Sequence, residues 1–288
     1  MNYRKKFLVE PGVKVRLDRI DPGYTGKHES REEAAPAIAK QVARMDRLQE
    51  LLYADGNQSL LVVLQALDAG GKDGVIRRLF SGMNPQGTKA VGFKTPSKLE
   101  ASHDFLWRAH VNAHAKGEVV IFNRSHYEDV LVARVHKLVS KEVWSNRYEM
   151  INHFEKMLSA NGARILKFFL HISPEEQLAR FKERLDDPAS RWKISESDYA
   201  ERKLWPQYIA AFEEALQRTS TRHAPWHVIP SNSKWFRDLA ISQIVADTLD
   251  DMGLTLPPPR VDIKDIRRKF HAAEKESKRG SGWSKREK

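Results

Sequence analysis

The feature that most constrains the fold is a glycine-rich loop placed between a buried strand and a helix. Residues 59–64 form a continuous apolar run, typical of a strand buried on both faces of a parallel sheet. The loop follows at residues 66–74, and its glycines let backbone N–H groups turn toward an anion at the helix N-terminus. The pattern predicts a phosphate-binding loop in which Lys72 reaches the phosphate, rather than an ordinary glycine turn with an exposed lysine. The other loop residues expected to bind the anion are Gly70, Gly71, Asp73 and Gly74.

The loop departs from the usual pattern, Gly-x-x-x-x-Gly-Lys-Ser/Thr, at two positions. Ala66 replaces the first glycine, and Asp73 replaces the hydroxyl that normally binds Mg²⁺. Because carboxylates are good ligands for Mg²⁺, Asp68 is the expected substitute and Asp73 the second candidate. Asp73 could equally be a first-turn carboxylate that the helix dipole favours, and the sequence leaves both interpretations open.

The rest of the chain predicts a doubly wound α/β fold. Further short apolar runs lie at residues 89–93, 118–122, 165–172 and 226–229. Helical patterns occupy residues 32–53, 73–81, 98–115, 125–138, 143–160, 174–185, 197–219 and 235–252. Strands that alternate with helices indicate a central parallel sheet, here five-stranded, with helices on both faces. We expect an extended arm at 1–30, the main domain at 31–256 and a flexible basic tail at 257–288.

A second polar segment follows the predicted strand 118–122. Ligands of doubly wound folds bind at the carboxyl ends of strands, so Asn123 and Arg124 should lie beside the phosphate loop. The planar guanidinium of Arg124 suits phosphate oxygens. Glu128 and Asp129 fall on the first turn of the next helix, where they could hold a metal or orient a second substrate. Alternatively, they only complement the positive helix N-terminus, and this is equally plausible for Asp129.

A third basic cluster predicts a lid at about residues 178–200. Arg180 and Arg184 are four residues apart and share a helix face. A turn at Asp187-Pro188 follows, and then Arg191 and Lys193. Basic side chains across a helix–turn–helix can clamp phosphates, as kinase lids do. The alternative is a solvated face with local salt bridges, and the neighbouring phosphate loop favours the lid.

Composition excludes several classes of protein. The chain has 288 residues, a net charge of +11 and no cysteine, so disulfides and thiolate metal sites are absent. Residues 260–288 hold 11 Lys/Arg against 5 Asp/Glu, and the basic excess therefore gathers at the chain end. A basic surface attracts polyanions. No apolar run reaches the length of a membrane span or follows the basic start as in a signal peptide, and we expect a cytoplasmic protein without a membrane partner.

Taken together, these motifs resemble the second family of polyphosphate kinases, which are P-loop proteins related in fold to thymidylate kinase. The likeness extends over roughly residues 3–257. Its distinctive stretches are residues 67–74, the Met-Asn-Pro-Gln-Gly run at 83–87, residues 123–129, the lid stretch and Trp205-Pro206. Asparagine at position 123, followed by Glu128-Asp129, resembles the family's class III, whose members accept both nucleoside monophosphates and diphosphates.

The resemblance implies reversible phosphoryl transfer from inorganic polyphosphate to AMP or ADP, and also to GMP or GDP. It implies that Asp68, Lys72 and Arg124 are catalytic and that Asp68 organises a metal ion. We expect Mg²⁺ or Mn²⁺, with Glu128 as a further ligand because of its place on the first turn of the helix. Substrate-binding residues implied by the family or by the lid are Asn84, Asn123, Arg134, Arg180, Lys182, Arg184, Arg191 and Lys193. A homodimer or homotetramer is expected.

Two rival functions remain at this point. The first is an ATP-dependent nucleoside monophosphate kinase, which would need a segment to hold the donor adenine, and residues 231–233 are a candidate. The second is a nucleic-acid-binding protein, suggested by the charge. It is disfavoured because the basic excess lies at the ends and no recognition motif with interleaved aromatic residues occurs.

Overall fold

The computed structural model describes residues 1–280, and residues 281–288 of the predicted tail lie outside the described residues. The chain divides into two compact units, Met1–Thr255 and Leu256–Lys288. In the part of the chain that the structure describes, no helix has both the length and the apolar character needed to cross a membrane.

The larger unit is built on one sheet with the strand order β1-β6-β5-β2-β4-β3. The five predicted strands are β2 (Ser59–Gln65), β3 (Thr88–Gly92), β4 (Val119–Asn123), β5 (Ala163–His171) and β6 (Trp226–Pro230), and all pair in parallel. A sixth strand, β1 (Leu8–Val9), pairs antiparallel with β6, so the expectation of five strands is wrong by one. A two-residue strand is too short to leave a periodic pattern in the sequence.

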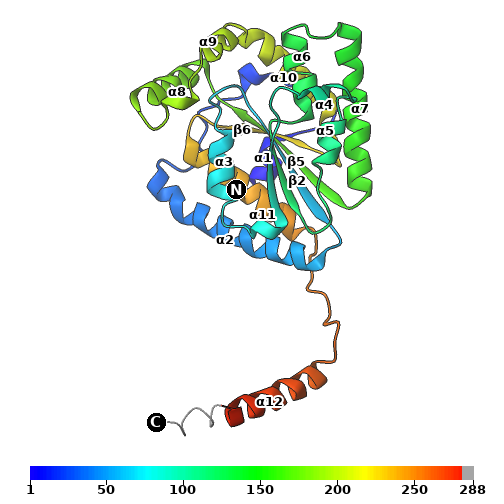
Figure 1. Ribbon diagram of the computed structural model, residues 1–288. Helices are drawn as coiled ribbons and strands as arrows, with labels where there is room; N and C mark the ends of the chain where they lie inside the picture. The colour runs from blue at the N-terminus through cyan, green and yellow to red at the C-terminus, as the bar shows by residue number, and fades with distance from the viewer. Residues whose placement is uncertain (281–288) are drawn as a thin grey trace. The chain divides into compact units, whose positions relative to one another are not determined.

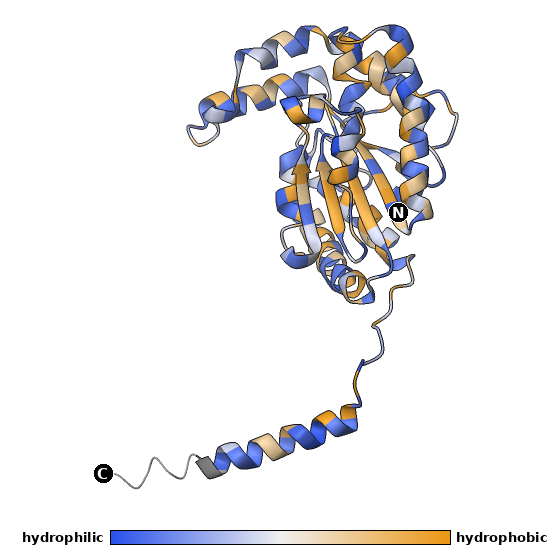
Figure 2. Ribbon diagram, turned by 45° about the vertical axis from the view of Figure 1, so that its right-hand side comes forward, coloured by the Kyte–Doolittle hydropathy of each residue, from blue (hydrophilic) through white to orange (hydrophobic). Residues whose placement is uncertain are grey.

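Helices cover both faces of the sheet (Figure 1). On one face lie α2 (Arg31–Asp55), α3 (Lys72–Leu79) and α11 (Lys234–Asp250), and on the other α7 (Lys141–Ala160) and α10 (Trp205–Thr219). All seven residues of β2 are buried, which explains why its sequence is continuously apolar instead of alternating. Figure 2 shows the same strands as the most hydrophobic part of the molecule.

Three helices expected as continuous are interrupted. The range 98–115 contains α4 (Lys98–Ala101) and α5 (Trp107–Val111). The range 125–138 contains the 3₁₀ turn η3 (His126–Asp129) and α6 (Val132–Val135). The range 197–219 contains α9 (Glu196–Lys203) and α10, because Pro206 occupies the first turn of a new helix.

The predicted lid comprises α8 (Pro174–Asp186), the 3₁₀ turn η4 (Arg191–Lys193) and α9. Two further 3₁₀ turns are η1 (Leu17–Arg19) and η2 (Pro85–Gly87).

The N-terminal arm is packed, although the sequence predicts an extended segment. Residues of α1 (Tyr3–Phe7) are buried against α11, with the Tyr3 and Phe236 rings 5.5 Å apart and the Phe7 and Phe236 rings 6.0 Å apart. β1 then closes the sheet edge beside β6. Four aromatic rings therefore attach the arm to the core, since Tyr24 also packs edge-on against Phe236.

The smaller unit contains α12 (Ile263–Gly280), within the segment predicted to be a flexible tail. The tail therefore has regular structure over these 18 residues, and its flexibility stays a prediction. Asp262 accepts a hydrogen bond from the backbone N–H of Lys264 at 2.8 Å, which caps the start of the helix. Ile263, Ile266 and Phe270 are exposed and spaced by three and four residues, so they share one helix face.

A buried ion pair joins β5, α7 and η3 beneath the carboxyl ends of the strands. Lys167 Nζ lies 2.6 Å from Glu155 Oε2, and both side chains are fully buried. Lys167 also donates to the Tyr127 hydroxyl at 2.8 Å and to the Thr219 carbonyl at 2.7 Å. Burial alone would raise the pKa of Glu155, but Lys167 and His126 hold that pKa below its usual value. The network fixes Tyr127, and with it the segment that follows β4.

We expect Lys167→Met to lower the free energy of unfolding by about 3–5 kcal/mol, because the Glu155 carboxylate is left buried without its cation. The double variant Lys167→Met/Glu155→Leu should be more stable than the single variant, since no uncompensated charge remains. Urea denaturation of the three proteins measures both differences. A single variant as stable as the double variant would contradict this account of the pair.

Candidate active site

The phosphate loop and the segment after β4 meet because their strands are neighbours. β2 and β4 pair in parallel with Leu64 opposite Asn123, so the chain leaves both strands at the same edge of the sheet. The backbone N–H of Arg124 donates to the Leu64 carbonyl at 3.0 Å, and Gln65 donates to the Ser125 hydroxyl at 3.1 Å. These two bonds hold the end of β2 against the segment that follows β4.

The phosphate loop has an unusual backbone. Gly71 has φ of +98° and caps the N-terminus of α3, and the non-glycine Ala69 has φ of +59°. A Cβ atom on Gly71 would lie 2.1 Å from Nη1 of the Arg237 side chain. Glycine is therefore required at position 71 for two independent reasons, the left-handed φ and the close approach of a guanidinium.

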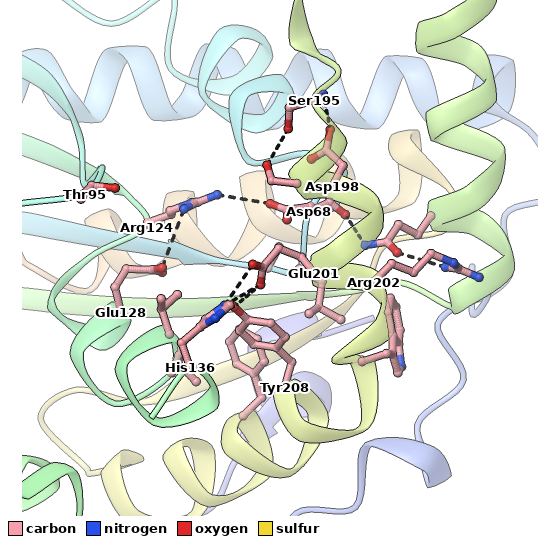
Figure 3. A pocket seen from close by; sticks show the side chains of 18 residues that line it. Asp68, Thr95, Arg124, Glu128, His136, Ser195, Asp198, Glu201, Arg202 and Tyr208 are labelled. Carbon is pink, nitrogen blue, oxygen red and sulfur yellow. Dashed lines mark hydrogen bonds and ion pairs between the residues drawn. The ribbon is translucent and has the colours of Figure 1, made fainter. Parts of the chain in front are cut away.

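Arg124 brings together two carboxylates predicted to hold a metal. Its own φ is +60°, and its Nη2 donates to Asp68 Oδ1 at 3.2 Å (Figure 3). Its Nη1 lies 3.9 Å from Glu128 Oε2. The sequence placed Asp68, Arg124 and Glu128 in one site, and the structure does bring them into contact.

Lys72 lies folded over the loop. Its Nζ donates to the Ala66 carbonyl at 3.0 Å. Burial lowers the pKa of Lys72 and Arg124 adds to that effect, while the carboxylates of Asp68, Glu128 and Asp73 oppose it. Burial also raises the pKa of Glu128, against the attraction of Arg124 and Lys72. The site is thus a compact set of opposite charges, where added phosphate or cation charge would act strongly.

Two adjoining cavities open from this cluster. The larger, of about 700 Å³, is lined by the whole loop 68–74, by Asn123 and by many cations. The cations are Lys72, Arg78, Lys94, Arg124, Arg180, Arg184, Lys193, Lys234 and Arg237. The smaller, of about 410 Å³, has an apolar wall that includes Val132, Trp205 and Phe212. Asp68 and Arg124 line both cavities and therefore stand at their junction.

A hydrogen-bonded triad that the sequence analysis missed borders the smaller cavity. Tyr208 donates to Glu201 Oε2 at 2.6 Å, and His136 Nε2 lies 3.0 Å from the same carboxylate (Figure 3). Burial raises the pKa of Tyr208, and Glu201 raises it further. The triad connects the lid helix α9 to α10 and to the end of α6. No motif signals it, because its members are up to 72 residues apart in the sequence.

Several predicted lid residues do contact the phosphate region. Arg184 and Lys193 line the larger cavity. Arg180 also lines it, but its guanidinium donates to the Ala69 carbonyl at 2.8 Å and to the carbonyls of Ser231 and Asn232. Arg180 is 4% exposed, so it holds the backbone of the loop in place more than it presents a free charge.

Four predicted substrate-binding residues line neither cavity, because each has another partner. Arg134 donates to Glu214 at 2.7 Å, and its guanidinium lies 4.4 Å from the centre of the Trp144 ring. Lys182 is exposed and pairs with Asp186, its helix neighbour. Arg191 donates to the Leu185 carbonyl at 2.9 Å. Asn84 caps η2 by accepting from the Gln86 N–H at 2.9 Å.

The two ambiguous aspartates differ in their surroundings. Asp129 lines neither cavity and lies between Arg108, at 3.3 Å, and Arg147, at 3.6 Å, so it anchors η3. Asp73 is exposed on the first turn of α3, lines the larger cavity and accepts from Asn123 Nδ2 at 2.6 Å. Asp73 can therefore contact a ligand in the larger cavity, whereas Asp129 holds η3 in place through its two arginine partners.

Arg237 is another residue of the site that the sequence did not reveal. It is 1% exposed, lines the larger cavity and donates to Asp238 at 2.8 Å. Burial lowers its pKa, although Asp238 opposes this shift. Asp238 also pairs with Arg78, and this ion pair joins α11 to α3, the helix that follows the phosphate loop. In the sequence, Arg237 is one cation in a helix that is otherwise apolar over most of its length.

The chain is similar to known proteins over most of its length. The family model described as Polyphosphate kinase 2 matches residues 28–256. An AMP/ADP-polyphosphate phosphotransferase of Meiothermus ruber is 50% identical over 263 residues, which cover 91% of this chain and 98% of the relative. An ADP-polyphosphate phosphotransferase of Rhodopseudomonas palustris is 41% identical, covering 88% and 92%. The crystal structure of polyphosphate kinase 2 from Arthrobacter aurescens TC1 superposes with a TM-score of 0.90 at 38% identity, covering 94% and 97%.

We expect Gly71→Ala to be more destabilising than Gly56→Ala. Both positions have positive φ, at +98° and +64°, but a Cβ on Gly56 meets no atom within 4 Å. Gly56→Ala should cost about 1–2 kcal/mol for the backbone alone. Gly71→Ala should cost about 1–3 kcal/mol more, because Arg237 must move. Urea denaturation measures both, and equal losses would mean that the contact with Arg237 is not a constraint.

Proposed function

The chain belongs to the polyphosphate kinase 2 family, and on this basis we propose that it moves a phosphoryl group reversibly between inorganic polyphosphate and purine nucleotides, converting AMP to ADP and ADP to ATP. The observation that carries this proposal is the junction of two unlike cavities at Asp68 and Arg124. A transfer reaction needs one site for the donor, one for the acceptor and charged groups between them.

The larger cavity suits the polyphosphate. Its cations come from α3, from the segments after β3 and β4, from the lid and from α11, so they form an extended surface instead of a single point. A long inorganic polyanion offers only phosphate oxygens for recognition, and lysine and arginine are the side chains that bind them. Arg184 and Lys193, from the segment expected to be a lid, supply part of this surface.

The smaller cavity suits the nucleoside. Trp205, Phe212 and Val132 offer apolar and aromatic contact to a base, and the triad of His136, Glu201 and Tyr208 offers polar groups. A nucleotide placed here would direct its terminal phosphate toward Arg124 and Asp68, at the junction. Asn123 is neutral and lies beside this junction, so it adds no repulsion toward the acceptor phosphate. This supports the use of both AMP and ADP.

The transfer itself needs positioning and charge neutralisation more than a strong base. An ionised terminal oxygen of the nucleotide attacks the terminal phosphorus of the polyphosphate, and the bond from that phosphorus to its bridging oxygen breaks. The bridging oxygen becomes the end of the shortened chain. Lys72 and Arg124 stabilise the negative charge on the transferred group.

We include Mg²⁺, or Mn²⁺ in its place, in the proposal. Among residues 1–280 no group of three or more potential ligands surrounds a single point. Mg²⁺ usually takes one or two carboxylates together with substrate phosphates, and Asp68 and Glu128 fit that pattern because both approach Arg124 from the same cavity. When bound, the ion would neutralise phosphate charge.

The two rival functions lose support. The segment 231–233, considered for a donor adenine, is engaged in the fold, because Arg180 binds the Ser231 and Asn232 carbonyls. The Asn232 side chain accepts from the Ser173 N–H at 3.0 Å. A nucleic-acid-binding role has no observation in its favour beyond the net charge. The expected homodimer or homotetramer and the cytoplasmic location stay predictions.

We expect purified protein with long-chain polyphosphate, Mg²⁺ and AMP to produce ADP first and ATP later, with no nucleoside triphosphate added. Parallel reactions with ADP, GMP and GDP define the acceptor range, and chelation of Mg²⁺ should stop transfer. Chromatography of the nucleotides at successive times gives the result. If ADP is used while AMP gives no product at high enzyme concentration, the proposed acceptor range is wrong and the kinase assignment survives.

We expect Lys72→Ala to lower the transfer rate by at least about 100-fold, because a cation at the transferred group stabilises the transition state by several kcal/mol. Lys182→Ala is the matched control. Both lysines are predicted to bind the substrates, yet the side chain of Lys182 is 75% exposed, pairs with Asp186 and lines neither cavity. The transfer rate of Lys182→Ala should stay within about twofold of the rate of the unaltered protein. Equal losses in both variants would contradict the geometry of the site.

A further inference from the structure

Arg237 is a buried cation in the wall of the larger cavity. The transfer site consists of the two cavities that meet at Asp68 and Arg124, and Arg237 lines only the larger one. Its side chain is almost fully buried, whereas Lys193 and Lys234 of the same cavity are exposed. Burying a charge is unfavourable unless the charge is paired, so the partners of Arg237 indicate its role.

The fold uses only part of the Arg237 guanidinium. Nε and Nη2 donate to Asp238 Oδ1 at 3.0 and 2.8 Å. Nη1 has no hydrogen-bond acceptor among residues 1–280, and it is not closed off from the cavity that Arg237 lines. Arg180 is also buried beside the loop, but all three of its guanidinium nitrogens donate to Glu176 or to backbone carbonyls. Arg237 therefore has a donor nitrogen for which the described chain supplies no acceptor.

One carboxylate offsets two guanidinium groups at this place. Arg78 Nε donates to Asp238 Oδ2 at 2.5 Å, so Asp238 is shared between Arg78 and Arg237. Burial lowers the pKa of Arg237, and repulsion from Arg78 and Arg180 lowers it further, against the attraction of Asp238. Two positive charges and one negative charge leave an excess of positive charge, which a bound anion would compensate.

The nitrogen without an acceptor lies at the phosphate loop. A Cβ atom on Gly71 would be 2.1 Å from Arg237 Nη1, so Nη1 lies against the residue that caps the N-terminus of α3. The first backbone N–H groups of a helix have no acceptor within the helix, and the helix dipole favours an anion at that end. A phosphate group at Gly71 could therefore accept hydrogen bonds from the loop and from Arg237 together.

We propose that Arg237 binds the polyphosphate donor through Nη1, and that the donor supplies the negative charge which this part of the fold lacks. This role rests on the proposed function, because the proposed function places the donor in the larger cavity. The nucleotide should not contact Arg237, which does not line the smaller cavity. Without the donor, the excess positive charge makes the protein less stable than it would be with a neutral side chain at position 237.

Calorimetric titration of the full chain with tripolyphosphate and Mg²⁺, without nucleotide, tests this role. Arg237→Met should weaken tripolyphosphate binding by about 10-fold to 100-fold, the range expected for a hydrogen bond from a charged group. The affinity of Arg237→Met for AMP should stay that of the unaltered protein. Arg237→Lys keeps the charge and should bind tripolyphosphate more tightly than Arg237→Met. Unchanged tripolyphosphate affinity in Arg237→Met, an equal loss for AMP, or equal affinities in the two variants would overturn the proposal.

Thermal unfolding without ligands separates this role from a structural one. Arg237→Met leaves Asp238 paired with Arg78 and removes a repelling cation, so the variant should unfold at the same temperature as the unaltered protein or at a higher one. Unfolding of Arg237→Met at a lower temperature would show that the charge of Arg237 serves the fold, and would overturn the proposal.

Arg44→Met is the matched control. Arg44 also pairs with aspartates of α11, Asp247 and Asp250, but it lines neither cavity. Arg44→Met should unfold at a lower temperature and bind tripolyphosphate as the unaltered protein does. Weaker binding in this control would mean that any disturbance of α11 lowers the affinity, and would overturn the specific role of Arg237. Binding as expected in all variants, without phosphoryl transfer to AMP or ADP by the unaltered protein, would contradict the proposed function alone.

Discussion

The parallel pairing of β2 with β4 is the constraint on which the rest of the site depends. With Leu64 opposite Asn123, two separate loops leave the sheet at one edge, and each strand end is bonded to the other through Arg124 N–H and Gln65. All seven residues of β2 are buried, and a shift in register would break the buried hydrogen bond from Gln65 to Ser125. The position of the phosphate loop relative to Arg124 thus follows from the hydrophobic core.

The loops carry unfavourable conformations that the core must sustain. Ala69 and Arg124 both have positive φ without being glycines, and such conformations persist where the surrounding structure fixes them. Arg180 holds the Ala69 carbonyl from the lid side, and the buried Lys167–Glu155 pair holds Tyr127, three residues after Arg124. These two networks hold the phosphate loop and the segment after β4 in place.

Charge is distributed unequally between the two cavities of the transfer site, and this gives them different chemistry. The larger is rimmed by cations from five parts of the chain, while the smaller adds aromatic side chains and a triad of hydrogen-bonded groups. Arg124 serves both, because it lies at the end of the central strand pair. The donor consists of phosphate alone, whereas the acceptor includes a base, so the two substrates need cavities of different chemistry. Both cavities lie at the same edge of the sheet.

The sequence by itself determined the features that depend on neighbouring residues. The continuous apolar run at 59–64, the glycine loop and the polar segment at 123–129 predicted the parallel sheet, the phosphate loop and the meeting of Asp68, Arg124 and Glu128, because burial and backbone freedom leave local patterns. Only the tertiary structure decided which cations reach the site. Arg134 and Lys182 have nearer carboxylates, Arg237 comes from a distant helix, and the Tyr208–Glu201–His136 triad unites three elements. A side chain's partner is set by which elements pack together, and no local period in the sequence records that choice.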